Sequence, residues 1–488
     1  MLFQGFNNGI KKYSNLINYI LIPFKLVVLL AFAYLSFSYL NIAFSNSNNV
    51  EPLRNYPDDV LDVLVIGSSH AQYSFNPSYF YADTSLYSHN FSSICQPLSA
   101  SYELLQESIK SQDVKLVILE IYTVLPTLAG CGSETGGIAA QYYLTGENKH
   151  RIINKIEYQD SSNYKNKYLH NPFLNNHNKW KDLKSFDSLI DPFESTKYQI
   201  SHNFGYVYLP RLINYNVWLA NTYDEYVDVK ISDENMAFLN GIYDLCQENN
   251  IELLLYKTPI DSIDIEIQSY FNEVWKWAES KDINYIDFVE KSKELGIYLY
   301  YHGDSFHLSI NGANIVTTYL SNYIKENYDF THNNDDKLNT IYQKSYNRDI
   351  RLLLKNEVDP LITINKLPKY TDPYIIRYVP DGTNNIDLNI FNLGHLDHSK
   401  AHFILIDNNE IVMMSESEIN TTYNNSKIII NESGIFINDN SLDLTTNFNL
   451  ILSDDTFSDL YIKNMIYEDN LWEYGYFYIY PKEIRDKW

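Results

Sequence analysis

Three polar residues that lie far apart in the sequence have the types that nucleophilic catalysis by serine requires. Ser69 lies in the stretch 62–70, DVLVIGSSH, where a hydrophobic run leads into a glycine and two serines. Asp304 and His307 stand three residues apart in the polar stretch 302–309, HGDSFHLS. A histidine in such a system takes the serine proton as a general base, and a carboxylate holds the histidine in the required tautomer. The sequence therefore contains the parts of a Ser-His-Asp triad, in the chain order Ser, Asp, His.

The surroundings of Ser69 fit this chemistry. The run before it predicts a buried strand, and open parallel sheets bind ligands beyond the carboxyl ends of their strands. Gly67 permits a tight turn, so Ser69 falls at the N-terminus of the next helix, where backbone N–H groups point toward developing negative charge. A serine in this position is more often only a helix cap. The presence of Asp304 and His307 favours the catalytic interpretation.

Other polar residues near these motifs receive structural interpretations. His70 and His302 flank the motifs, and such histidines are more often surface groups or hydrogen-bonded ones. Asp287, at the end of a predicted strand, is expected to cap a helix or line the cleft, and we favour the structural role. Glu120 also ends a predicted strand and is assigned no role. The sequence has no phosphate loop, dinucleotide-binding glycine motif or metal-ligand cluster, which predicts chemistry without a cofactor or metal.

The elements that must position the three residues follow an α/β pattern from residue 60 to residue 328. Short apolar runs alternate with amphipathic ones of helical length, as in a parallel sheet covered by helices. We predict strands at 60–66, 86–91, 116–121, 251–256 and 284–288. We predict helices at 100–111, 233–248, 267–280 and 311–328, the first two capped by Ser99 and Ser232. This pattern predicts a flavodoxin-like three-layer αβα sandwich.

Two further regions interrupt or follow the α/β pattern. Residues 128–226 are far longer than an ordinary loop and predict an insertion that forms a lid over the site. Residues 329–350 are polar and predict a linker, and residues 351–488 predict an all-β sandwich. The strands expected there are at 374–379, 386–391, 402–406, 427–430, 448–452, 460–462 and 476–480.

Residues 26–44 predict a membrane-spanning helix near the start of the chain. This stretch of 19 residues contains no charge, and as a helix it would be about 28 Å long, close to the ~30 Å thickness of the hydrocarbon core. Lys11, Lys12 and Lys25 precede it, so residues 1–25 are expected in the cytoplasm and the bulk of the chain outside it. A cleaved signal peptide is the alternative, but the apolar run is longer than such peptides usually have.

Charge and cysteine content restrict the possible partners. The net charge of −24 would repel a phosphate backbone, so a nucleic-acid partner is not expected. The three cysteines, Cys95, Cys131 and Cys246, are too few for a disulfide scaffold and wrongly spaced for a zinc site. Outside the cytoplasm Cys95 and Cys131 could pair, and two buried thiols are an equal alternative.

The motifs resemble those of the SGNH/GDSL hydrolase family over residues 60–328. Residues 67–69, GSS, are similar to its Gly-Asp-Ser nucleophile block, and residues 304–307, DSFH, to its Asp-x-x-His block. The strings VIGSSHAQYSFNP and DSFHLSINGA resemble the membrane-anchored branch that includes alginate O-acetylation proteins and the D-alanyl transfer protein of lipoteichoic acid modification. That branch acts on cell-surface polymers.

The sequence departs from this family where the oxyanion hole is expected. The family's Gly-x-Asn-Asp block supplies an asparagine, whereas the matching strand here reads ILEIY at 118–122. The glycine of the family's second block also has no match. The resemblance then implies an oxyanion hole made by the backbone N–H of Ser69 and one from residues 92–96, assigned to Cys95, with Asn90 as a side-chain candidate.

These observations lead to one functional hypothesis and one alternative. The hypothesis is a membrane-anchored, extracytoplasmic serine esterase or O-acyltransferase that acts on acyl groups of a cell-surface glycan or exopolysaccharide. It could work beside a multi-span membrane acyltransferase, and the sequence leaves hydrolysis or transfer open. The alternative is a non-catalytic SGNH-like surface protein that binds glycan or scaffolds a complex for polysaccharide export or modification.

Overall fold

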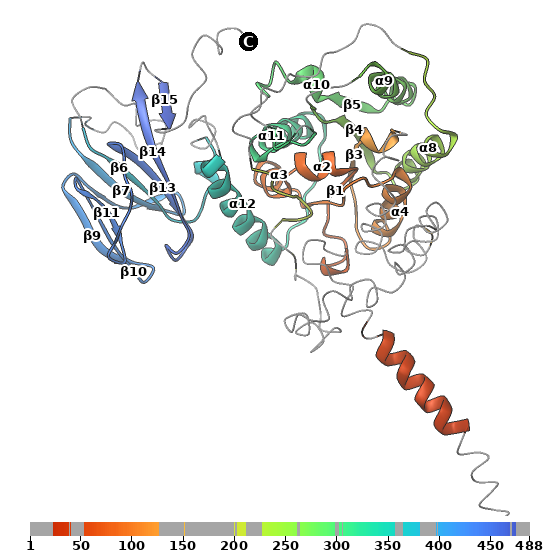
Figure 1. Cartoon of the computed structure of the whole chain (residues 1–488), viewed down its shortest axis with the longest axis horizontal. Helices are drawn as coiled ribbons and strands as arrows, with labels where there is room; N and C mark the ends of the chain where they lie inside the picture. Colours follow the sequence, from red (N-terminus) through yellow and green to blue (C-terminus); the bar gives the residue numbers. More distant parts are fainter. Residues whose placement is uncertain are drawn as a thin grey trace, which may run out of the picture.

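The structure is a computed structural model. It describes residues 23–38, 40, 53–125, 151, 200, 203–210, 227–260, 264–297, 302–304, 306–356, 365–380, 397, 399–468 and 471–474. Two parts follow each other along the chain: an α/β part and a β part, which helix α12 joins (Figure 1).

A five-stranded parallel sheet forms the centre of the α/β part. Its strands are β1 (Val63–Ile66), β2 (Ser88–Asn90), β3 (Leu116–Glu120), β4 (Glu252–Lys257) and β5 (Asn284–Asp287). The strand order β2-β1-β3-β4-β5 is the flavodoxin-like order, and every neighbouring pair is parallel. The predicted α/β class is confirmed, because each of the five predicted strands overlaps a strand of this parallel sheet.

Helices cover both faces of this sheet because alternate strand residues point to opposite sides. One face packs on α4 (Leu98–Ser108), α8 (Asp233–Glu248) and α9 (Ile265–Ser280), and the other packs on α2 (Ser69–Ser74), α3 (Pro77–Thr84) and α11 (Ile310–Asn327). Ser232 caps α8 as predicted, with its side chain accepting from the Asn235 N–H. The prediction for Ser99 is wrong: α4 begins one residue after Pro97, which leaves Ser99 buried inside the helix.

Residues 329–350 are largely helical, so the prediction of a linker there is wrong. Helix α12 spans Asp336–Asn356 and also extends into the region assigned to the β-sandwich. Leu338, Tyr342, Tyr346 and Ile350 recur every four residues and are buried, which gives the helix one continuous apolar stripe. Because polar residues separate these four, the average composition of the segment does not indicate a helix.

The β part consists of two antiparallel sheets. Six strands form one sheet in the order β15-β14-β13-β6-β7-β8: β6 (Tyr374–Tyr378), β7 (His402–Asp407), β8 (Glu410–Ser415), β13 (Phe448–Ser453), β14 (Leu460–Glu468) and β15 (Leu471–Tyr474). Four strands form the other in the order β12-β11-β10-β9: β9 (Glu418–Tyr423), β10 (Ser426–Asn431), β11 (Gly434–Ile437) and β12 (Asn440–Ser441). The predicted strands at 386–391 and 476–480 lie outside the described residues.

The central strands of the six-stranded sheet are buried on both faces. Ile375 and Leu405 belong to a core shared with the four-stranded sheet, whereas Ile376 and Ile404 belong to a core shared with α12 and α3. This double burial explains why the strands read as continuous apolar runs without alternation. The second core also contains Tyr79 of α3, so the α/β and β parts pack on each other through α12.

Most of the predicted insertion and part of the predicted membrane helix lie outside the described residues. Of residues 128–226, the structure describes residues 151, 200 and 203–210. Residues 23–38 are helical, and residues 39 and 41–44 are not described. Within the described part of the chain, no helix combines the length and the apolar character needed to cross a membrane.

Candidate active site

The structure brings Ser69, His307 and Asp304 into one hydrogen-bonded chain. The Oγ of Ser69 lies 2.8 Å from Nε2 of His307. The other ring nitrogen, Nδ1, lies 2.9 Å from Oδ2 and 3.0 Å from Oδ1 of Asp304. These are the distances at which a histidine can take a serine proton while a carboxylate holds its ring. The three residues thus have the geometry of a Ser-His-Asp triad across 238 residues of sequence separation.

The turn after β1 places Ser69 at the carboxyl edge of the sheet. Ser68 is the N-cap of α2 and accepts a hydrogen bond from the His70 N–H, so Ser69 is the first helical residue. The first N–H groups of a helix have no partner within the helix. None of the described residues accepts a hydrogen bond from the Ser69 N–H. This N–H is therefore available to an oxyanion beside the nucleophile, as the sequence analysis expects.

A tight turn before α11 holds His307 and Asp304 together. Oδ1 of Asp304 accepts hydrogen bonds of 2.8 Å from the backbone N–H groups of both Phe306 and His307. Burial acts to raise the pKa of Asp304, but the hydrogen bonds from His307 and Phe306 outweigh it and leave this pKa below its usual value. The carboxylate is therefore ionised at neutral pH and can stabilise a positively charged His307.

Two further histidines lie beside the triad and are uncharged at neutral pH. The His70 ring stacks on Tyr122 at 3.8 Å between centroids and lies 5.2 Å from the His307 ring. Burial, with the nearby charge of His307, lowers the pKa of His70 to about 3, and burial lowers the pKa of His302 to about 4. His302 is 1% exposed, and neither ring nitrogen has a partner among the described residues. The expectation of a surface or hydrogen-bonded group is therefore wrong for His302.

Glu120, to which the sequence analysis assigns no role, contacts the nucleophile turn directly. Its buried carboxylate accepts hydrogen bonds from the Ser68 N–H at 3.1 Å, the Ser68 hydroxyl at 2.6 Å and the Tyr122 N–H at 2.6 Å. Burial raises the pKa of Glu120 to about 7 although these hydrogen bonds oppose the shift. The available sequence signal was a carboxylate at the end of a predicted strand.

Gly67 is required by this contact with Glu120. A Cβ atom at position 67 would lie 2.6 Å from Cβ of Glu120 and 3.1 Å from Cβ of Ala71. Real Cβ atoms do not approach other atoms so closely. The glycine therefore serves close packing of the turn against the end of β3.

The two other residues expected near the oxyanion have different surroundings. Asn90 donates from Nδ2 to the backbone oxygens of Ala71 at 2.8 Å and Phe75 at 3.1 Å, which uses both of its N–H bonds to hold the C-terminal end of α2. Its side chain has no N–H left for an oxyanion, so that assignment is wrong. Cys95 lies in the loop after β2 with a left-handed backbone, φ 52°. Its N–H as a donor to the oxyanion stays a prediction.

The cysteines of the described chain are in two states. Cys95 is disulfide-bonded, and Cys246 is a free, buried thiol. Cys131, which the sequence analysis considers as a partner of Cys95, lies outside the described residues.

A short described piece of the insertion, residues 203–210, packs beside the site. Its backbone receives a hydrogen bond from Asn90 at Phe204, donates one from Val207 to the Gln72 oxygen, and receives another from Ile310 at Leu209. It therefore connects β2, the nucleophile helix and the start of α11. Most residues of the predicted lid lie outside the described part of the chain, so the lid stays a prediction.

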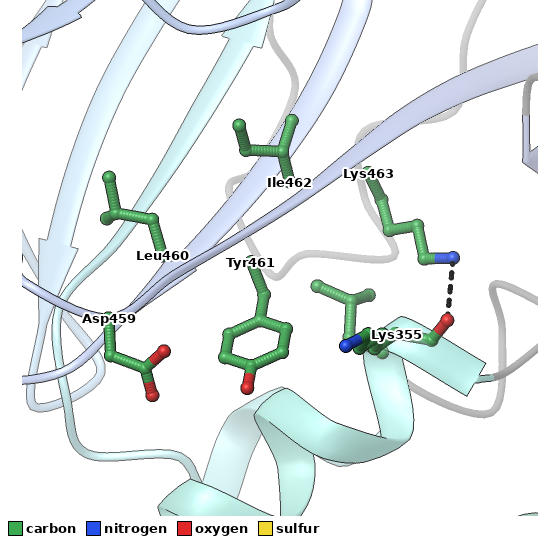
Figure 2. Close-up of a pocket in the computed structure, with 7 residues that line it drawn as sticks. Lys355, Asp459, Leu460, Tyr461, Ile462 and Lys463 are labelled. Carbon is green, nitrogen blue, oxygen red and sulfur yellow. Dashed lines mark hydrogen bonds between the residues drawn. The ribbon is translucent and has the colours of Figure 1, made fainter. Parts of the chain in front are cut away.

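Two hollows in the described surface are separate from the triad. One, of about 890 Å³, lies beside α9, β5 and α10, and the other, of about 360 Å³, lies between the end of α12 and β14. Figure 2 shows the smaller one, where the Tyr461 ring points toward α12 and Lys463 donates to the Lys355 backbone oxygen. Asp287, at the edge of the larger hollow, caps α10 and pairs with the buried Lys257 at 2.8 Å, in accord with its structural interpretation.

Comparisons with known proteins add no family assignment. No family model matches this chain, and no curated protein matches it. Among the described residues, no group of three or more His, Cys, Asp or Glu side chains is arranged to hold a metal ion. The chemical interpretation of the site therefore depends on its geometry.

Proposed function

We propose that this protein is a serine-dependent acyl hydrolase or O-acyltransferase, similar to SGNH/GDSL hydrolases. The observation that carries the proposal is the 2.8 Å contact between Ser69 Oγ and His307 Nε2, together with the Asp304 carboxylate on the opposite ring nitrogen. A helix-capping serine needs neither partner. The parallel sheet, with Ser69 at the carboxyl end of a central strand, further supports this class.

In each of the two halves of the proposed reaction, His307 takes one proton and then gives it up. His307 Nε2 takes the Ser69 proton while Oγ attacks the ester carbonyl carbon, and the carbonyl oxygen becomes an oxyanion next to the Ser69 N–H. The ester bond then breaks, His307 gives its proton to the leaving alcohol, and the acyl group stays on Ser69. An acceptor hydroxyl loses its proton to His307, attacks the acyl carbon and receives the acyl group, and the proton returns to Ser69.

Asp304 is proposed to orient His307 and to stabilise its positive charge during both steps. Replacing such a carboxylate by an amide keeps the shape but favours the wrong tautomer of the ring, and it can lower the rate by about 10⁴-fold. We therefore expect Asp304→Asn to fold normally and to be strongly impaired in acylation.

The proposed setting is the cell surface. The resemblance to membrane-anchored O-acetylation and D-alanyl transfer proteins supports an acyl group on a cell-surface glycan or exopolysaccharide as substrate. The uncharged stretch 26–44 supports a membrane anchor, which would hold the domain near a multi-span acyltransferase. If water is the acceptor the protein is an esterase, and if a sugar hydroxyl is the acceptor it is an O-acyltransferase.

A non-catalytic glycan-binding or scaffolding role is the second candidate. It is favoured by the side chains around the expected oxyanion hole, because β3 supplies a carboxylate and Asn90 is engaged with α2. Loss of one oxyanion donor typically costs about 10²–10³-fold in rate. A protein of this second kind would not activate Ser69.

Labelling with a fluorophosphonate probe tests the proposal. The full-length protein should gain one adduct by intact mass, and the adduct should be absent in Ser69→Ala and greatly reduced in His307→Ala and Asp304→Asn. Ser280→Ala, which removes an exposed hydroxyl on α9, is the control and should label like wild type. No adduct on folded wild-type protein would contradict catalysis and support the binding role.

A further inference from the structure

The end of β3 lies next to the nucleophile turn because β3 and β1 are neighbours in the sheet. Ile66 pairs with Leu119, so Glu120 follows directly beside Gly67 and Ser68. The Glu120 side chain is fully buried, and among the described residues no basic side chain forms a salt bridge with it. A buried carboxylate without a cation is costly unless hydrogen bonds satisfy its oxygens. The donors that satisfy it here come from Ser68 and Tyr122.

We propose that Glu120 is a positioning residue, which fixes the nucleophile turn by accepting two hydrogen bonds from Ser68. This inference rests on the proposed function for its catalytic consequence and on the contacts of Glu120 for its structural one. Glu120 stands where the family that the sequence resembles would supply an oxyanion donor. Above its pKa of about 7, Glu120 is ionised and only accepts hydrogen bonds, so its contribution must pass through the residues that it holds.

The hydrogen bonds show how this effect would reach Ser69. The Ser68 hydroxyl donates to Glu120 Oε2 at 2.6 Å and accepts from the His70 N–H at 3.2 Å. The Ser68 hydroxyl therefore connects the end of β3 to the first turn of α2. It links Ser68, which precedes Ser69, to His70, which follows it. With Gly67 packed against Glu120 Cβ, this connection determines where the Ser69 N–H and Oγ point.

The contacts of Glu120 divide between a structural cap and the nucleophile turn. Its bond from the Tyr122 N–H caps the 3₁₀ turn Ile121–Val124 that follows β3, whereas its two bonds from Ser68 hold the turn before Ser69. Glu120 Oε2 accepts hydrogen bonds from both donors of Ser68, and Oε1 accepts one from the N–H of Tyr122. The ring of Tyr122 stacks on His70. Each of these partners touches the first turn of α2.

A double-mutant cycle tests the proposal on the full-length protein. Glu120→Gln, Ser68→Ala and the double variant are compared with wild type in the rate constant of fluorophosphonate labelling, normalised to folded protein. Labelling is measured at pH 8.5, where Glu120, with its pKa of about 7, is ionised. Glu120→Gln keeps the size but leaves one uncharged acceptor oxygen for three donors, so the hydrogen bonds from Ser68 weaken or the Tyr122 N–H loses its acceptor. We expect each single variant to label about 10- to 100-fold more slowly, as for loss of a hydrogen bond to a charged group. The double variant should be no slower than the slower single one, because both remove the same connection.

Hydrogen–deuterium exchange provides a second readout that needs no activity. A peptide covering residues 67–75 should exchange faster in Glu120→Gln and Ser68→Ala than in wild type, because the start of α2 is released. Glu279→Gln, on the exposed face of α9, is the matched control and should change neither labelling nor exchange.

The outcomes separate this inference from the proposed function. If wild type labels but the folded Glu120→Gln variant labels at the wild-type rate, the inference is overturned and the proposed function stands. If the effects of the two substitutions multiply, Glu120 and Ser68 act separately and the inference is also overturned. If wild type does not label, the proposed function fails, and unchanged exchange at residues 67–75 would overturn the positioning role as well.

Discussion

Replacing the buried His302 should change how the stability of this protein depends on pH. The pKa of His302 falls from 6.5 in the unfolded chain to about 4 in the folded protein, because burial disfavours its charged form. Between these two values the unfolded chain binds a proton that the folded protein does not. The free energy of unfolding therefore falls as the pH falls through this window. We expect His302→Leu to remove this contribution.

The size of the effect follows from the distance between the pH and the unfolded pKa. At pH 5.0, 1.5 units below the unfolded value of 6.5, one buried histidine costs roughly 1.36 kcal/mol per unit, or about 2 kcal/mol. At pH 7.5 the cost is close to zero. Because neither ring nitrogen of His302 has a partner among the described residues, His302→Leu should be at least as stable as wild type at pH 7.5.

Urea unfolding at pH 7.5 and pH 5.0 measures this difference. Wild type should lose about 2 kcal/mol more than His302→Leu between the two pH values. His332→Leu, which replaces an exposed histidine, is the control and should follow wild type at both pH values. If wild type and His302→Leu lost equal free energy of unfolding between the two pH values, His302 would not be buried in its uncharged form.

Three further predictions follow from packing and hydrogen bonds. Gly67→Ala should destabilise the protein by about 1–3 kcal/mol in urea unfolding and slow fluorophosphonate labelling, because the added Cβ would lie 2.6 Å from Cβ of Glu120; an unchanged midpoint would contradict this. Asn90→Ala should cost about 2 kcal/mol, since the carbonyls of Ala71 and of the C-cap residue Phe75 each lose one side-chain donor, and a thermal melt without a shift would contradict it. Asp349→Ala should expose α12 to limited proteolysis, because Asp349 accepts from two side chains at the start of α3; wild-type resistance would contradict it.

The layer structure of the α/β part could be predicted because its signal is local. The central strands β1 and β3 are buried on both faces, so they consist almost entirely of apolar residues, as in 63–66, VLVI. Helix α12 was missed for the opposite reason. Its apolar stripe is a minority of its residues, and distant elements bury it: Leu338 and Tyr342 pack in the core of the α/β part, and Tyr346 and Ile350 pack in the core with the six-stranded sheet and α3. The composition of this segment is therefore typical of a linker, whereas the four-residue spacing of Leu338, Tyr342 and Tyr346 is typical of a helix.

The candidate site was only partly predictable from residue types. Ser69, Asp304 and His307 could be chosen because few combinations of side chains support acyl transfer, and their local motifs set two of the three distances. Asn90 was misassigned because a sequence does not show which donors the backbone of α2 uses. His302 was expected to be exposed or bonded, and its burial follows from packing by residues distant in the chain.

The types of the reacting groups, the parallel α/β core and the β-rich C-terminal part can be predicted from residue types and short-range periodicity alone. Which of the reacting groups come into contact depends on the fold. Ser69 and His307 approach to 2.8 Å because β1 and the turn before α11 end at the same edge of the sheet. Glu120 reaches Ser68, 52 residues away in the sequence, because β3 pairs with β1. Such contacts depend on strand order, which no short stretch of sequence encodes.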